Sequence, residues 1–229
     1  MPKDETIWRE GLTTPGRNGR GRLCTALACA AWFAALPADA QVRVGAFADA
    51  GRTAFGGVAP DGVKYGARAG FGAGATVDVR IATNVSLSSG VVYVQRGSTL
   101  QLGESRDGEP LAELPVRVNY VGIPVGFAIW KGPWSVGSSV AFHFLASASA
   151  DWQDAAIDLQ DAFEPWDCEA HIDVTREFGT GSRHWFAGLQ YQVGLLDVWK
   201  QGPIAGTSVV VPQFKNSGIA LRLGVLFGL

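Results

Sequence analysis

The feature that most constrains the fold is an alternation of apolar residues with polar residues and glycine, which returns in eight segments of the chain. In the clearest segment, odd positions such as Tyr65, Phe71 and Val79 are apolar, while even positions hold glycine or residues such as Arg68 and Asp78. A period of two places successive side chains on opposite faces of a strand. We therefore predict an all-β chain of eight strands, each with one apolar face. The segments are residues 42–50, 65–80, 85–96, 120–129, 134–144, 169–178, 185–195 and 219–229.

The connections between these segments alternate in length. Three are tight, at residues 82–84, 131–133 and 179–183. The other four are long. Short turns at one end and long loops at the other are typical of an eight-stranded antiparallel up-and-down transmembrane β-barrel. The long connections are residues 55–62, 97–113, 150–168 and 197–214.

The content of the polar face decides between a membrane barrel and a soluble, lipocalin-like barrel with an apolar interior. Glycine supplies 30 of the 229 residues and is concentrated on the polar face, beside charges of both signs. Small residues and paired charges suit the narrow lumen of eight strands, and the apolar face then meets hydrocarbon. We expect the lumen charges to pair across the barrel and to leave a plugged or very narrow lumen. They are Arg43, Asp49, Arg68, Asp78, Arg80, Glu169, Asp173, Glu177 and Arg222.

The N-terminal segment has the pattern of a cleavable signal peptide. Arg17, Arg20 and Arg22 precede an apolar run over residues 23–36, which is too short to span a bilayer, and Ala38-Asp39-Ala40 follows. We divide the chain into residues 1–40, a signal peptide with an N-terminal extension, and residues 41–229, the barrel domain. Cleavage after residue 40 leaves one cysteine, which excludes an internal disulfide and a cysteine-based zinc site.

The long connection after residue 150 is the most distinctive candidate binding surface, because acidic residues recur in it with aromatic residues between them. If residues 155–163 were helical, four aspartates would share one face and could bind a divalent cation or a basic partner. A solvated acidic loop is the alternative, and the glycine-bearing spacing of an EF-hand is missing from this segment. The candidate residues are Asp151, Trp152, Asp154, Asp158, Asp161 and Trp166.

The histidines of the polar face are the candidate catalytic residues. Ser139 lies four residues before His143, and Asp173 lies two residues after His171, so a hydrolase site is conceivable. No Gly-x-Ser-x-Gly motif accompanies Ser139. We expect a buried polar network at these positions, with no enzyme activity, no cofactor and no metal.

Three segments carry a family resemblance. The C-terminal RLGVLFGL, residues 222–229, resembles the signal read by the barrel-assembly machinery, with Gly224, Phe227 and Leu229 in the characteristic positions. The segment NYVGIPV, residues 119–125, and LSSGVVY, residues 87–93, resemble strands of the PorT-type or porin-family outer-membrane β-barrels, small barrels of the OmpX and OmpA kind. This resemblance covers the mature chain and implies a location in the outer membrane of a Gram-negative-type bacterium.

These observations favour a structural or surface-interaction protein whose long loops meet an extracellular partner. A small-solute pore is the alternative, and a lipid-modifying enzyme is the third reading. The expected partners are outer-membrane lipid and the barrel-assembly machinery, with a monomeric barrel. Nucleic acid is not expected, because 19 basic residues against 21 acidic ones leave a net charge of −2.

Overall fold

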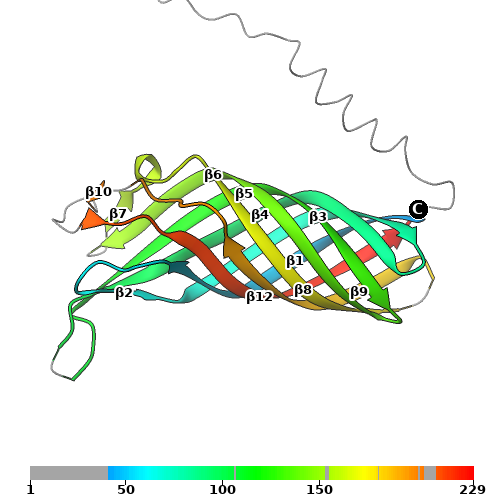
Figure 1. The fold of residues 1–229 in the computed structure, drawn as a ribbon, viewed down its shortest axis with the longest axis horizontal. Coiled ribbons are helices and arrows are strands. Elements are labelled where there is room, and N and C mark those ends of the chain that lie inside the picture. The colour runs from blue at the N-terminus through cyan, green and yellow to red at the C-terminus, as the bar shows by residue number, and fades with distance from the viewer. Residues whose placement is uncertain (1–40, 106, 153–154, 180, 201, 204–209) are drawn as a thin grey trace, which may run out of the picture. The chain divides into compact units, whose positions relative to one another are not determined.

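A computed structural model describes residues 41–229 except 106, 153–154, 180, 201 and 204–209 (Figure 1). The predicted signal peptide, residues 1–40, lies outside the described residues. No helix in the described part of the chain is long and apolar enough to cross a membrane. The strands are β1 (Gln41–Gly56), β2 (Val63–Gly66), β3 (Arg68–Ala82), β4 (Val85–Leu102), β5 (Ala112–Lys131), β6 (Trp134–Trp152), β7 (Ala155–Asp158), β8 (Trp166–Phe178), β9 (Arg183–Gly194), β10 (Gly202–Pro203), β11 (Val210–Val211) and β12 (Lys215–Gly228).

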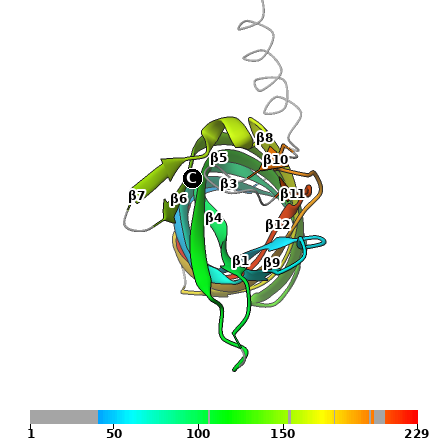
Figure 2. The ribbon, with the colours of Figure 1, turned by 90° about the vertical axis from the view of Figure 1, so that its left-hand side faces the viewer.

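Eight of these strands form a closed ring, as Figure 2 shows from the end that carries β7, β10 and β11. The order around the ring is β1, β3, β4, β5, β6, β8, β9 and β12, and β12 pairs again with β1. Every pairing in the ring is antiparallel. The predicted eight-stranded antiparallel barrel is therefore confirmed.

The two ends of the barrel differ. At the turn end, the tight connections link β3 to β4, β5 to β6 and β8 to β9. Strand β1 begins and strand β12 ends at this same end of the barrel. At the loop end, β4 and β5 remain paired as far as Leu102 and Ala112, and β7 adds to the outer part of β6. The loop end therefore carries most of the irregular chain.

The outer surface of the ring is apolar along most of its length. Val125, Phe142, Leu189 and Leu221, from four different strands, are between 45% and 54% exposed. Exposed aromatics lie toward both ends, with Trp134 and Trp185 near the turns and Trp166 at the start of β8. An apolar band with aromatic residues near its edges is what a lipid-facing barrel presents.

Strands β4 and β5 are longer than the alternation predicted, because their apolar residues change from the outer to the inner face along the strand. Toward the loop end the apolar residues turn inward: Leu100 and Leu114 are buried, while Gln101 and Glu113 face out and form a side-chain hydrogen bond of 3.3 Å. The outer face of each strand is apolar only within the apolar band, so the outward alternation places the end of a strand at the edge of this band. Residues 97–102 were therefore wrongly assigned to a loop.

Residues 155–163 are not helical, so the condition under which four aspartates would share one helical face is not met. The chain forms β7 and then a single 3₁₀ turn, η1 (Gln160–Ala162), whose first backbone N–H donates to Asp158 Oδ1 at 2.9 Å. Pairing of β7 with the outer part of β6 satisfies backbone groups that a helix would otherwise have satisfied within itself.

Leu221, 54% exposed on the outer surface near the middle of β12, tests which face meets lipid. In lipid vesicles, Leu221→Arg is expected to lower the free energy of unfolding by about 2–4 kcal/mol, because a charge there would enter hydrocarbon. Leu229→Arg, one residue past the end of β12, should cost only about 0–1 kcal/mol. Denaturant titration of both variants measures this, and equal costs would contradict a lipid-facing band.

Candidate functional site: charged layers and an aromatic plug inside the barrel

The turn end of the lumen is crossed by a buried ion-pair network. Arg43, 1% exposed, donates from Nε and Nη2 to Asp78 Oδ1 at 2.9 and 2.6 Å and from Nη1 to Glu177 at 2.7 Å. Arg80 lies 3.5 Å from the other Glu177 oxygen, and both guanidinium groups lie against the Trp130 ring. Carboxylates from opposite walls thus hold one arginine across the barrel.

A second pair lies further along the lumen. Arg222 Nη2 donates to Asp49 Oδ2 at 2.8 Å and to Gln190 Oε1 at 3.0 Å, and its guanidinium lies over the Phe47 ring. Gly72 is required beside this pair, because a Cβ there would overlap Asp49 Oδ1. Between the two pairs is a cavity of about 120 Å³, bordered among others by Trp130, Asp173, Glu177 and Gln190.

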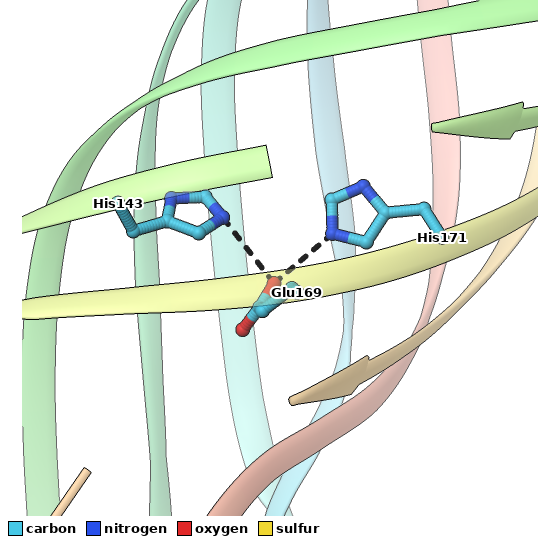
Figure 3. Close-up of side chains that lie close together, drawn as sticks. All are labelled: His143, Glu169 and His171. Carbon is cyan, nitrogen blue, oxygen red and sulfur yellow. Dashed lines mark hydrogen bonds and ion pairs between the residues drawn. The ribbon is translucent and has the colours of Figure 1, made fainter. Parts of the chain in front are cut away.

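The ion-pair network at the turn end and the Asp49–Arg222 pair form the first two charged layers of the lumen. The third layer is the most deeply buried, and in it two histidines surround one carboxylate (Figure 3). Glu169, 1% exposed on β8, accepts from Arg96 Nε at 3.2 Å and from Arg96 Nη2 at 3.0 Å. His171 Nε2 lies 3.0 Å from Glu169 Oε2, and His143 Nε2, from β6, lies 3.3 Å from the same oxygen. Both imidazoles therefore converge on one carboxylate oxygen.

The two histidines differ in their remaining contacts. His171 Nδ1 is 3.4 Å from the hydroxyl of Ser139, its partner in the pairing of β6 with β8. His143 is 1% exposed, yet among the described residues neither of its ring nitrogens has a hydrogen-bond partner. Its 3.3 Å contact with Glu169 lacks the alignment of a hydrogen bond. His143 lies against Gly122, where a Cβ would overlap Nδ1.

A buried acid lies next to this cluster. Asp167, fully buried, is paired in register with His143. Its carboxylate accepts from Asn216 Nδ2 at 2.8 Å and from the backbone N–H of Cys168 at 2.7 Å. The carboxylate is thus held by neutral donors and contributes its negative charge to the third layer.

Beyond the third layer, the loop end of the barrel is filled by an aromatic plug, defined here as Phe55, Phe163, Trp199 and Phe214. Each of these side chains is at most 4% exposed. The Phe55 and Phe214 rings stack with centroids 3.9 Å apart, and the Phe163 and Trp199 rings meet edge to face at 5.1 Å. Backbone hydrogen bonds from Glu164 to Val198 and from Lys200 to Ala162 tie the two loop segments together above the lumen.

The structure brings most of the predicted lumen charges together. Arg43, Asp78, Arg80 and Glu177 form the first layer, Asp49 and Arg222 the second, and Glu169 the third.

Two predicted lumen charges behave differently. Arg68 Nη1 donates to the backbone carbonyl of Val116 at 2.7 Å, and Asp173 accepts from the Thr175 hydroxyl at 3.3 Å. Neither makes an ion pair among the described residues. Arg96 and Asp167 were missing from the predicted network. Arg96 does lie on the inward face of its segment, and that position could have identified it.

The candidate catalytic pairings are also rearranged. Ser139 contacts His171 rather than His143, and His171 contacts Glu169 rather than Asp173. The contact of Ser139 with His171 runs between β6 and β8, so spacing within one strand could not indicate it. Glu169 and His171 lie two residues apart on β8, so the alternation of that strand places them on the same face.

The candidate loop surface is dispersed. Asp151 pairs with Arg117 at 3.0 Å, Asp158 caps the 3₁₀ turn, and the backbone carbonyl of Asp161 accepts from Lys200. Trp166 is the first residue of β8 and is 51% exposed. Asp154 lies outside the described residues, as does the side chain of Trp152.

At the assembly motif, Gly224 contacts the Phe186 ring, and Phe227 and Leu229 are 40% and 85% exposed. The reading of this motif by the assembly machinery stays a prediction.

Comparison with known families matches residues 39–200 to the family described as outer membrane protein beta-barrel domain. The chain belongs to this outer-membrane β-barrel family. The protein is accordingly located in the bacterial outer membrane, and the apolar band of the barrel faces lipid. No curated protein matches the chain in sequence.

Solved structures with similar folds include other outer-membrane barrels. Neisserial surface protein A is 12% identical, with 80% of this chain and 96% of that one covered and a TM-score of 0.44. OprG from Pseudomonas aeruginosa is 10% identical, with 85% and 97% covered and a TM-score of 0.42. Ail, the attachment invasion locus protein of Yersinia pestis, is 12% identical. Its structure in complex with a heparin analogue gives a TM-score of 0.38, with 82% of this chain and 97% of that one covered.

Removal of one partner from the buried Arg96–Glu169 pair is expected to destabilise this outer-membrane barrel. Arg96→Met should lower the free energy of unfolding in lipid vesicles by about 3–5 kcal/mol, because Glu169 would remain buried without its counter-charge. Lys64→Met is the matched control, since it breaks the exposed Lys64–Glu104 pair and should cost about 0–1 kcal/mol. Similar losses in both variants would show that burial of the pair is not what matters.

Proposed function

We propose that the protein is a closed barrel that acts through its loop-end surface rather than as a channel. The observation that carries this proposal is the filled interior. Two ion-pair layers and a histidine–carboxylate cluster occupy the lumen, and the aromatic plug covers them at the loop end. The cavity of about 120 Å³ that lies between the first two layers is far smaller than an aqueous channel through a larger barrel.

The loop end offers the surface for such a role. The β4–β5 hairpin extends past the ring to Leu102 and Ala112, and β2 pairs with its outer part. Exposed charges of both signs lie on this extension and beside it, including Lys64, Glu104, Arg117 and Asp151. An extracellular partner that binds by complementary charge would meet this hairpin and the β6–β7 hairpin first.

The proposal also covers the PorT-type relationship, the absence of enzyme activity and the monomeric state of the barrel. A PorT-type relationship is supported by the NYVGIPV and LSSGVVY segments, together with the glycine-rich segment before them. A non-enzymatic role is supported by the inward direction of Ser139 and His171, which face the lumen and not the lipid. The small-solute pore remains the competing function, and the barrel is treated as a monomer that contacts outer-membrane lipid.

Single-channel recording tests the proposal directly. The refolded mature barrel, residues 41–229, is expected to insert into a planar bilayer and to pass no stable current, because the charged layers and the plug block the lumen. A sixteen-stranded porin in the same bilayer provides the open reference, since barrels of that size hold an aqueous channel. Stable unitary steps from the folded barrel would contradict the closed lumen and favour the pore.

The same vesicles distinguish the enzymatic reading. Mass spectrometry of their phospholipid and lipopolysaccharide should find unchanged acyl chains after incubation with the barrel. Loss of acyl chains with the wild type but not with Ser139→Ala would assign a lipid-modifying activity to this protein.

A further inference from the structure

We propose that His143, Glu169 and His171 form a binding site for one divalent transition-metal ion of the Zn²⁺ type inside the barrel. The inference goes beyond the proposed function and does not depend on whether the lumen conducts. It also departs from the sequence-based expectation, which included no metal.

The geometry of the three residues carries the proposal. Their ligand atoms, one from each residue, all lie within 4.8 Å of one another. Each histidine Nε2 faces Glu169 Oε2, at 3.3 Å for His143 and 3.0 Å for His171. Zinc–ligand bonds of about 2.0–2.2 Å imply edges of roughly 3.3 Å between ligands of a tetrahedral ion. Two of the three edges already have nearly this length, so only the approach of the two imidazoles to each other needs adjustment.

The state of His143 is the second observation. Its imidazole is 1% exposed, and among the described residues neither nitrogen has a hydrogen-bond partner, although Nε2 lies only 3.3 Å from Glu169 Oε2. Buried polar groups normally have partners. Coordination through Nε2 would give this nitrogen a partner, and it requires only the neutral imidazole with its proton on Nδ1.

The surroundings of His171 have the form of an outer coordination shell. With Nε2 as the ligand atom, Nδ1 carries the proton and faces the Ser139 hydroxyl at 3.4 Å. Metal-bound histidines usually donate their other N–H to such an oxygen, which fixes the tautomer and the ring orientation. Ser139 is thus placed to orient His171.

Arg96 is the cation that faces the proposed site, and its contacts leave room for a metal. It binds both Glu169 oxygens, with Nε on Oε1 and Nη2 on Oε2. A carboxylate oxygen has two acceptor positions, so Oε2 can hold Arg96 on one and a metal on the other. Buried Asp167, next to His143 in register, supplies a second negative charge that offsets Arg96.

The donor set defines the class of ion. Two imidazoles and one carboxylate suit Zn²⁺, Co²⁺ and related ions, whereas Ca²⁺ and Mg²⁺ prefer shells of oxygen ligands. Three protein ligands leave a further coordination position for water. The cluster lies beneath the aromatic plug, so the ion would enter most readily as the barrel folds.

Cobalt binding tests the site. The mature barrel is refolded with excess Co²⁺, freed of unbound ion and measured for bound metal and for visible absorption. The expected result is one Co²⁺ per barrel with the absorption of a four- or five-coordinate ion. Excess Zn²⁺ added together with Co²⁺ during refolding should abolish this absorption, whereas excess Mg²⁺ should leave it unchanged.

Three histidine variants locate the ion. His143→Gln and His171→Gln should each weaken binding at least tenfold, whereas His184→Gln, at the turn end, should leave binding unchanged. Absence of stoichiometric Co²⁺ in the folded wild type would overturn the proposal. Equal loss of binding in His184→Gln would overturn it as well.

X-ray absorption of the zinc-loaded wild type keeps the test decisive if a variant does not fold. The expected spectrum contains two imidazole nitrogens at about 2.0–2.1 Å. A shell of oxygen atoms alone would overturn the assignment.

Discussion

Closing eight strands into one ring leaves no unpaired strand edge in lipid, but it also leaves an interior only wide enough for side chains to fill. The rest of the structure depends on this restriction. Charges that point inward must find partners within a few ångströms, and Arg43, Arg96 and Arg222 each do so. Glycine is used where a side chain from one wall would collide with one from another, as at Gly72 beside Asp49 and at Gly122 beside His143.

The same restriction shapes the two ends of the lumen differently. Between the turn end and the middle, polar side chains face one another across the axis, because the outer face has to be apolar to meet lipid. Above the lipid this requirement disappears, and the usual arrangement of a water-soluble sheet returns, with Leu100 and Leu114 inside and Gln101 and Glu113 outside. The aromatic plug is the core of this upper part.

The period of two in the sequence predicted the number of strands in the ring and the face of each strand, and the alternating lengths of the connections predicted their antiparallel order. Arg43 and Asp78 were assigned to the lumen on this basis, and the structure places them there as an ion pair. The ends of β4 and β5 could not be predicted in the same way, because the apolar face changes sides near Arg96. The contact of His143 with Glu169 depends on how β6 and β8 are aligned, and one sequence does not contain that alignment. The plug combines Phe55 with residues about 110–160 positions further along the chain, so only the folded loops reveal it.

The seam between β1 and β12 has a consequence for how the molecule is made. Asp49 and Arg222 form their ion pair across this seam, although 173 positions separate them in the chain. Contacts between such distant residues form late in folding, because the intervening chain must first be ordered. A nascent barrel therefore has two open strand edges until its last strand arrives, and those edges can pair with other chains in the meantime. A chain that ended before β12 would keep both edges, those of β1 and β9, together with an Asp49 that lacks its cation, so a stable membrane protein requires this last strand.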